Sequence, residues 1–332
     1  MSTAQGSSLP GTLDLAVILL NYRRADLVLD CLASLEPECR GAPGICVIVV
    51  DNASGDGSAA RIAEAIGARG WGGWARLVES PVNGGFSAGN NVGIAAVAAE
   101  HYLLLNSDTL VRPGALAALL ATMRAQPEVG LLGPRLEGPD GVAQESCFRF
   151  HSPWSELMAA AATGPISRLL RRHAVALPAA DAPHEAEWIS FACVLIRAAA
   201  LREIGLLDDA YFMYFEDMDY CRRAREKGWR IRYEPAAHVV HLRGGSSPVK
   251  QAFAERRRVP TYYFASRTRY FAKYYGGTLG VVLANSAWLA GRCVSLAREL
   301  VGNKRPHTAE RHAFDIWTRW LRPLAPPERP AS

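Results

Sequence analysis

The chain has 332 residues, of which 49% are hydrophobic and 21% are charged, and its formal net charge is +5. This length and apolar content allow a large core without disulfides or structural metals, so they exclude a disordered chain and a small disulfide-stabilised scaffold. A net charge this small gives no indication of a nucleic-acid-binding protein.

The cysteines and the N-terminal residues indicate a cytoplasmic protein. The seven cysteines are odd in number and form no CxxC pair, a pattern typical of reduced thiols in a cytosol-like compartment. Residues 1–11 are polar and small, without a basic stretch followed by an apolar core, so no secretory signal is predicted. We therefore expect a cytoplasmic location.

Buried strands alternate with helices in the first third of the chain. Apolar runs and helical periodicity predict strands at 15–20, 46–50, 77–80 and 102–105 and helices at 26–35, 59–66, 86–99 and 113–124. This alternation predicts βαβ units and therefore an α/β fold with a mostly parallel sheet. Ligands bind beyond the carboxyl ends of such strands. The polar residues Asp51-Asn52 and Asn106-Ser107-Asp108 follow two of these strands, so they are site candidates.

The alternation stops after Pro134. The later patterns predict strands at 188–196 and 229–233, helices at 198–204 and 220–227, and amphipathic helices over 250–320. We expect a nucleotide-binding domain at 13–248, a helical region at 249–322 that is a candidate for membrane association, and flexible tails at 1–12 and 323–332.

Two motifs near strand ends are candidates for nucleotide binding. Asp51 can accept hydrogen bonds from a nucleobase or a ribose, although the same residue also suits a turn and helix cap. The glycine-rich stretch Asn83–Asn91 can bring backbone close to a phosphate, although small residues also permit close helix packing. Asn21-Tyr22-Arg23-Arg24 stands where a dinucleotide-binding dehydrogenase would carry GxGxxG, which weighs against that class.

Carboxylates and a histidine further along the chain are candidates for metal binding and catalysis. Asp108 follows a buried strand, where a carboxylate suits Mg²⁺ or Mn²⁺, and His241 next to a glycine turn is a candidate second ligand. Glu216-Asp217-Met218-Asp219 precedes a basic helix, so these acids also suit a helix dipole. The aromatic residues before them can desolvate one carboxylate and make it a better general base.

The C-terminal third combines basic, aromatic and apolar residues. Arg267, Arg269 and Lys273 alternate with tyrosines and phenylalanines, a pattern that suits an anionic membrane surface as well as a solvated helix face. The apolar stretch 278–290 has 13 residues, fewer than the roughly 20 that span a bilayer. We therefore expect peripheral association rather than a transmembrane helix.

Taken in order, these motifs resemble the family 2 inverting glycosyltransferases of the GT-A fold, and among them the rhamnosyltransferase-like branch that builds bacterial cell-surface polysaccharides. The segments that carry the resemblance are Asn21-Tyr22, VDNASGDGS, NGGFSAGNN, LLLNSDT, FMYFEDMDYCRRAREKGW and HVVHLRGGS. The resemblance covers roughly residues 13–275, most of the chain. The resemblance implies a GT-A type α/β fold, with a mostly parallel nucleotide-binding sheet flanked by helices and a helical C-terminal appendage.

The resemblance also implies how the nucleotide sugar is bound. Tyr22 would stack on the nucleobase and Asp51 would hydrogen-bond to it. Asn83, Gly84 and Asn90 would line the rest of the nucleotide-sugar pocket.

For the reaction itself, the resemblance assigns three acids and a histidine. Asp108 would be the carboxylate of a DxD-like motif and would bind the nucleotide sugar through Mg²⁺ or Mn²⁺, with His241 as a second metal ligand. The motif has one acid here where many members have two or three. Asp217 would be the general base, and Glu216 an acceptor-side or orienting group.

The expected activity is therefore transfer of a sugar, with inversion, from a nucleotide sugar to a hydroxyl of a cell-surface polysaccharide or lipid-linked glycan. The first choice of donor is dTDP-rhamnose, and a polyprenyl-linked acceptor would place the protein on the inner face of the plasma membrane. Two alternatives stay open: a sugar-nucleotide pyrophosphorylase, for which a glycine-rich loop after the first strand is missing, and an inactive nucleotide-sugar-binding scaffold of the same fold.

Overall fold

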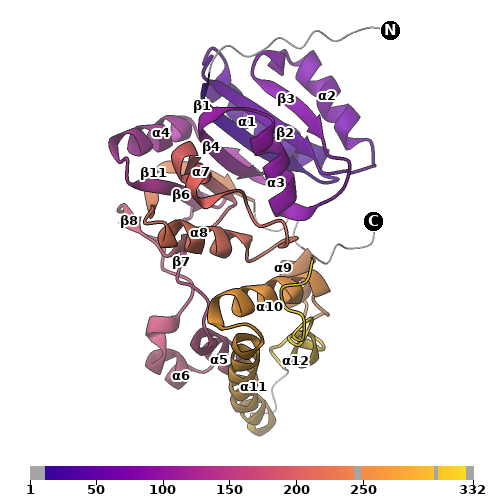
Figure 1. Cartoon of the computed structure of the whole chain (residues 1–332), viewed down its shortest axis with the longest axis vertical. Helices are drawn as coiled ribbons and strands as arrows, with labels where there is room; N and C mark the ends of the chain where they lie inside the picture. The colour runs from indigo at the N-terminus through magenta and orange to yellow at the C-terminus, as the bar shows by residue number, and fades with distance from the viewer. Residues whose placement is uncertain (1–11, 243–247, 303–305, 327–332) are drawn as a thin grey trace.

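The structure, a computed structural model, describes residues 12–242, 248–302 and 306–326. Figure 1 shows an α/β part built around a central sheet and, below it, a helical part that contains α5, α6 and α9 to α12. Of the predicted tails at 1–12 and 323–332, residues 1–11 and 327–332 lie outside the described residues, as does the glycine turn after His241.

A mixed sheet forms the centre of the α/β part. Among the described residues it has nine strands, in the order β3-β2-β1-β4-β10-β6-β11-β5, with β8 paired to β11. Its strands are β1 (Leu13–Asn21), β2 (Ile45–Asp51), β3 (Ala75–Glu79), β4 (Ala99–Asn106), β5 (Thr109–Val111), β6 (Val129–Glu137), β8 (His184–Glu185), β10 (Cys193–Arg197) and β11 (Arg230–His241). Strands β3, β2, β1 and β4 are parallel, and β10 runs antiparallel to β4 and β6. A separate small ribbon pairs β7 (Cys147–Phe148) with β9 (Trp188–Ile189).

The helices fall into two groups. Those of the α/β part are α1 (Ala25–Cys39), α2 (Ser58–Ala68), α3 (Gly85–Ala95), α4 (Ala115–Ala125), α7 (Ala198–Ile204) and α8 (Glu216–Glu226). Those of the helical part are α5 (Pro153–Ala161), α6 (Gly164–Leu169), α9 (Pro248–Ala254), α10 (Thr261–Tyr275), α11 (Thr278–Val301) and α12 (His312–Asp315).

The apolar strands are buried on both faces of the sheet. Ile18, Ile48 and Leu104 belong to one hydrophobic cluster, whereas their neighbours Val17 and Val49 belong to the other. Successive side chains of a strand point to opposite faces, so a strand covered on both sides needs a continuous apolar run. This confirms the predicted α/β fold and explains why alternating polarity is missing from these segments.

Several predicted boundaries differ from the structure. The predicted helix at 220–227 begins at Glu216, so the acidic motif forms the first turn of α8 instead of preceding it. Acids are stabilised in a first turn by the helix dipole, which explains why the helix starts so early. The predicted strand at 188–196 is two strands, β9 and β10, and the strand at 229–233 continues to His241.

The basic-aromatic segment of α10 is part of the core, not of the surface. Phe264, Arg267, Tyr270 and Phe271 are at most 2% exposed. Arg267 is neutralised by Glu156 of α5, with Nη2 2.8 Å from Oε2. The expectation that these side chains form a membrane surface is therefore wrong for the buried ones, because they hold the helical part together.

Helix α11 is longer than the predicted apolar stretch. It runs for 24 residues, and by length and composition it is the one helix among the described residues that is apolar enough to cross a membrane. Of its most apolar window of 18 residues, 39% is buried against the rest of the protein. The predicted stretch of 13 residues ended too early, because the helix continues past Arg292 with further apolar residues.

Candidate functional site

Strand ends in the parallel part of the sheet meet at one edge. The register pairs Asn21 of β1 with Asp51 of β2, and β4 ends beside them. Oδ1 of Asp51 accepts hydrogen bonds from Asn21 Nδ2 and Ser54 Oγ, both at 2.6 Å, and Oδ2 accepts one from the Ser54 amide at 3.0 Å. Asp51 thus ties the end of β1 to the turn before α2. Its nucleobase role stays a prediction, as does that of Tyr22, which is 38% exposed at the same edge.

A side-chain clasp joins the strand end to the glycine-rich loop. Asn52 Nδ2 donates to Oδ1 of Asn83 at 2.9 Å and to the Gly85 carbonyl at 3.0 Å. In return, the Gly84 amide donates to Oδ1 of Asn52 at 3.3 Å. The two motifs that the sequence separates by thirty residues therefore form one polar surface at the edge of the sheet.

The small residues of α3 serve close packing. A Cβ on Gly93 would lie 2.4 Å from Ile18, and one on Gly89 would lie 2.5 Å from Leu20, so only glycine lets the helix approach β1 this closely. The buried side chain of Asn90 donates to the Phe86 carbonyl at 2.9 Å. These contacts support the packing alternative for this stretch, and a pocket role for Asn90 stays a prediction.

The start of α3 lies directly against the loop that precedes the acidic motif. The Phe86 amide donates to the carbonyl of Phe212 at 2.7 Å, so this amide of the first turn is already occupied by protein. Gly85 has φ of +82°, and a Cβ there would lie 2.0 Å from the same carbonyl oxygen. Glycine is required at this position for its conformation and for the close approach. The glycine-rich loop is thus placed beside residues 212–217.

Asp108 and His241 are brought together by the pairing of β5 with β11. His241 pairs with Thr109, and the amide of Leu242 donates to the Asp108 carbonyl at 2.9 Å. Nε2 of His241 lies 3.6 Å from Oδ2 of Asp108, and both side chains are buried. Burial opposes ionisation of Asp108, but the hydrogen bond and charge of His241 outweigh it and lower the pKa of that carboxyl.

This pair has the donor chemistry for a divalent cation. The Nδ1 atom of His241 is buried and has no hydrogen-bond partner among the described residues. The described residues hold no group of three or more His, Cys, Asp or Glu that could bind a metal. Two protein ligands are nevertheless enough for Mg²⁺, which usually completes its shell with waters and substrate phosphates. The pair therefore fits a cation that arrives with a diphosphate.

The acidic motif begins α8 directly after a strained turn. Tyr214 and Phe215 have φ of +71° and +69°, a left-handed conformation that is costly for bulky residues and is found mostly at functional sites. Glu216 is buried, and its Oε2 atom has no hydrogen-bond partner among the residues that the structure describes. Asp217 is half-buried, and its Oδ1 accepts the Met218 amide at 2.8 Å.

Burial makes two of these carboxyls weak acids. Burial raises the pKa of Asp217 to about 6. The hydrogen bond from the Met218 amide and the positive charges of His151 and Lys250 lower this pKa, but they do not offset the burial. Burial also raises the pKa of Glu216 well above its ordinary value, and the charge of Asp217 adds to the effect. An acid with a pKa near the working pH is well suited to accept a proton from a hydroxyl. Of the two, Asp217 is the one with partial access to solvent.

Lys250 connects the two acidic sites. Its ammonium lowers the pKa of both Asp108 and Asp217, so it lies within electrostatic range of both carboxylates. Lys250 and His151 were not predicted as site residues, because nothing in the local sequence pattern distinguishes them from ordinary surface residues. The loop before the acidic motif thus contacts the glycine-rich loop through Phe212, and one lysine is within electrostatic range of both Asp217 and Asp108.

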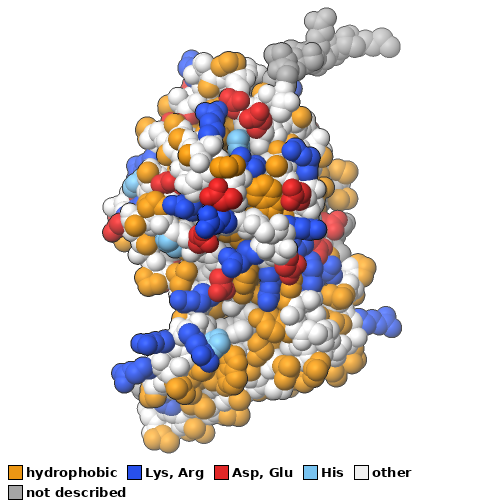
Figure 2. Space-filling model, turned by 60° about the vertical axis from the view of Figure 1, so that its left-hand side comes forward, with side chains coloured by type: hydrophobic (Ala, Val, Ile, Leu, Met, Phe, Trp, Pro, Cys, Tyr) orange, Lys and Arg blue, Asp and Glu red, His pale blue; other side chains and the backbone are white. Residues whose placement is uncertain are grey.

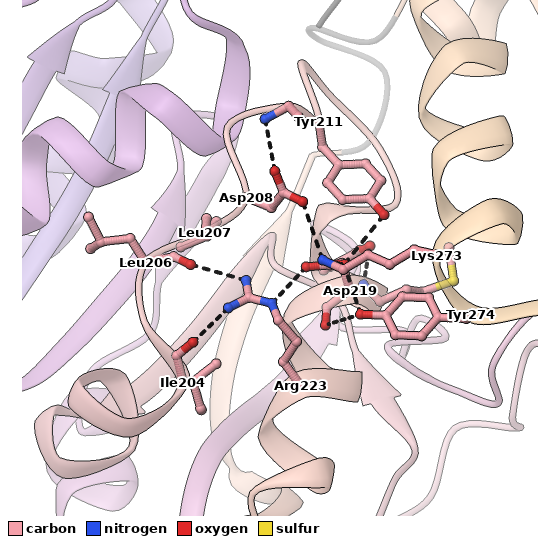
Figure 3. A network of polar contacts seen from close by, with 12 residues as sticks. Ile204, Leu206, Leu207, Asp208, Tyr211, Asp219, Arg223, Lys273 and Tyr274 are labelled. Carbon is pink, nitrogen blue, oxygen red and sulfur yellow. Dashed lines mark hydrogen bonds and ion pairs between the residues drawn. The ribbon is translucent and has the colours of Figure 1, made fainter. Parts of the chain in front are cut away.

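Asp219 has a structural role that goes beyond complementing the helix dipole. Figure 3 shows its carboxylate at the centre of a polar network between α8 and α10, with Arg223, Lys273 and Tyr274 pointing towards it. Arg223 Nε lies 2.8 Å from Oδ2, and Tyr274 Oη lies 2.8 Å from Oδ1. Lys273 also bonds to Asp208 at 3.3 Å. This network fixes the acidic helix against the helical part.

Comparison with known proteins connects the chain to sugar transfer. Residues 10–261 match the model of the family described as glycosyltransferase like family 2. An N-acetylglucosaminyl-diphospho-decaprenol L-rhamnosyltransferase of Mycobacterium tuberculosis is 31% identical over 170 residues, which are 49% of this chain and 53% of that protein. A pre-mycofactocin glycosyltransferase of the same species is 32% identical over 50% of this chain and 32% of that protein. The chain thus spans about half or less of the length of these relatives.

Solved structures share the fold at low identity. One is a mannosyltransferase of Pyrobaculum calidifontis, solved with GDP-mannose and Mn²⁺, which superposes with a TM-score of 0.55 at 16% identity. The superposition covers 91% of this chain and 79% of the mannosyltransferase chain. Another is GalNAc-T7, solved with UDP, GalNAc and Mn²⁺, which superposes with a TM-score of 0.57 at 14% identity. The superposition covers 94% of this chain and 58% of the GalNAc-T7 chain. Together with the family match, these superpositions confirm the predicted GT-A type architecture.

Proposed function

Because the chain belongs to the glycosyltransferase like family 2, we propose that it transfers a sugar from a nucleotide sugar to a hydroxyl acceptor by a single inverting displacement. The observation that carries the proposal is the half-buried Asp217, whose pKa is raised to about 6 at the start of α8. It lies within range of the same lysine as the Asp108–His241 pair.

Asp217 is the proposed general base. Its carboxylate would take the proton of the acceptor hydroxyl while that oxygen attacks the anomeric carbon from the face opposite the leaving diphosphate. Positioned bases typically contribute about 10²–10⁴-fold to the rate. The buried Glu216 next to it would orient the acceptor, because its Oε2 atom has no hydrogen-bond partner among the described residues.

Asp108 and His241 are the proposed ligands of Mg²⁺ or Mn²⁺. A cation held there would neutralise the charge that develops on the leaving nucleoside diphosphate. The pair would thereby hold the diphosphate next to the proposed pocket of Tyr22, Asp51, Asn83, Gly84 and Asn90. The two solved structures with Mn²⁺ support divalent-metal use in this fold.

The first choice of donor is dTDP-rhamnose, and the first choice of acceptor is a lipid-linked or cell-surface glycan. The relative named as a rhamnosyltransferase on a decaprenol-linked sugar supports both choices. We further propose that residues 13–248 form the catalytic domain and residues 249–322 the appendage, with the protein in the cytoplasm at the inner face of the plasma membrane.

A screen for donor hydrolysis tests the proposal. The purified chain is incubated with dTDP-rhamnose and with UDP- and GDP-sugars, in Mg²⁺, Mn²⁺ or EDTA, and release of nucleoside diphosphate is measured. We expect metal-dependent release from one donor class. Release of pyrophosphate from a nucleoside triphosphate and a sugar phosphate would instead identify a pyrophosphorylase. Nucleotide binding without turnover of any donor or acceptor would identify a scaffold.

A further inference from the structure

Helix α11 presents a face without charged side chains to solvent. Its large exposed side chains are Leu279 (64% exposed), Leu283 (50%), Val294 (41%), Leu296 (43%), Leu300 (74%) and Val301 (91%), which we call the α11 apolar face. The other exposed residues of the helix are all Ala, Ser, Thr or Cys. At 1.5 Å per residue, the helix carries this face over about 36 Å. Large apolar side chains gathered on one exposed face of a folded protein mark an interaction site.

The side of α11 that faces the protein is the more polar one. Asn285 accepts a hydrogen bond from Arg267 at 2.7 Å, and Arg292 pairs with Glu299 at 2.8 Å. Ordinary surface helices have the opposite arrangement, with the apolar stripe facing the core. A membrane-spanning position is disfavoured, because leaving the protein would bring these polar groups into hydrocarbon.

Exposed arginines lie in and directly after α6, the helix that follows the α11-packing helix α5. Arg168 of α6 and the following Arg171 and Arg172 are exposed, and residues 162–180 contain no acid. Leu169 among them is 80% exposed. Helix α6 follows directly after α5, and α5 packs so closely on α11 that a Cβ on Gly291 would lie 2.3 Å from a backbone oxygen of α5. Figure 2 shows Lys and Arg side chains at one border of the hydrophobic surface in the lower part of the molecule.

We propose that the α11 apolar face and the α6 arginines form a docking surface for an anionic lipid bilayer, with α11 lying along the interface. A helix that combines an apolar face with neighbouring arginines matches the chemistry of that boundary. A second copy of the chain is a poorer occupant, because a twofold interface would bring the arginine clusters of both copies near each other.

Docking would also hold the acidic helix in a defined position near the bilayer. Lys273 and Tyr274, in the last turn of α10, bind Asp219 of α8, and α11 begins at Thr278. Membrane docking rests on the proposed function in one respect: a bilayer would present the lipid-linked acceptor that this function requires. Binding of the surface to lipid is independent of that function.

Vesicle flotation of the full chain tests the surface. Vesicles of phosphatidylcholine alone are compared with vesicles that also contain phosphatidylglycerol. We expect tighter binding to the anionic vesicles. Leu283→Gln and Leu300→Gln should each weaken binding to both kinds of vesicle by about tenfold, since each removes a side chain that inserts. Arg168→Gln and Arg171→Gln should each weaken binding to anionic vesicles by about fivefold.

Two exposed residues of the α/β part provide matched controls. Val142→Gln and Arg202→Gln likewise replace one exposed apolar and one exposed basic side chain by glutamine, away from the docking surface, and should leave vesicle binding unchanged. The proposal is overturned if the wild-type chain does not float with vesicles, or if the α11 variants float as the wild type does. It is also overturned if the wild-type chain is a dimer in solution and the α11 variants are monomers that still bind vesicles. Thermal unfolding shows that each variant is folded. Donor hydrolysis without vesicles should be equal in the wild type and all variants. If none of these proteins hydrolyses a donor while the wild type still binds vesicles, only the proposed function is refuted.

Discussion

Replacing Asp217 by asparagine removes a proton acceptor while keeping the shape of the side chain. The pKa of about 6 means that the wild-type carboxylate is ionised and ready to accept a proton above that pH. We expect Asp217→Asn to lower kcat by about 10²–10⁴-fold and to leave the Kd for the nucleoside diphosphate unchanged. Wild-type kcat/KM should fall about tenfold per pH unit below pH 6.

The same substitution should stabilise the fold at neutral pH. The pKa of Asp217 rises from an ordinary value of 3.8 to about 6 on folding, and each pKa unit corresponds to about 1.4 kcal/mol. The ionised carboxylate therefore costs the folded state at most about 3 kcal/mol above pH 6. Between pH 6 and 3.8 the folded state binds the proton that the unfolded state lacks, so wild-type stability increases as the pH falls.

Urea unfolding at several pH values measures both effects. The free energy of unfolding of Asp217→Asn should exceed that of the wild type by about 1–3 kcal/mol at pH 8, and the difference should vanish near pH 4. Asp209→Asn, an exposed acid on the preceding loop, serves as the control and should change neither activity nor stability. Full activity of Asp217→Asn, or a variant less stable than the wild type at pH 8, would refute the reasoning.

Three further substitutions test other parts of the structure. His241→Ala should weaken Mn²⁺-dependent binding of a nucleoside diphosphate by about tenfold or more, measured by calorimetry with and without the metal, and equal affinities would remove His241 from the metal site. Glu156→Gln should cost about 3–5 kcal/mol because it leaves the buried Arg267 uncompensated. Arg267 outweighs burial and lowers the pKa of Glu156 to about 2, so its contribution is present above pH 4.5 and is lost as the pH falls towards 2; acid unfolding of both proteins checks this. Gly85→Ala should destabilise far more than the control Gly55→Ala, since both glycines have positive φ but only the new Cβ at position 85 meets a carbonyl oxygen, at 2.0 Å; similar melting temperatures would contradict this.

Local sequence patterns predicted the α/β class and the strand-end motifs well, for a physical reason. A strand covered on both faces needs a continuous apolar run, and β1, β2 and β4 each have one. The turn residues after these runs also identify the end of the sheet where ligands bind. Asp51 and Asn52 therefore lie where the sequence placed them, at the carboxyl ends of parallel strands.

Sequence patterns were weaker where the chain leaves regular alternation. The acidic motif read equally as a helix cap and as a catalytic group, because both uses require acids before a basic helix. What separates the two uses is ion pairing: Asp219 is neutralised by Arg223 and Lys273, whereas Glu216 forms no ion pair among the described residues. That distinction depends on α10, which lies more than forty residues further along the chain.

By itself, then, the sequence determined the elements and their chemistry, because periodicity and turn residues are local properties. The tertiary structure alone decided which groups act together. It paired Asp108 with His241 through the contact of β5 with β11, and it brought Gly85 against Phe212. It also turned the arginine and aromatic residues of α10 inward and left the apolar face of α11 exposed. Such contacts join residues far apart in the chain, so the local patterns did not predict which sides of α10 and α11 are covered.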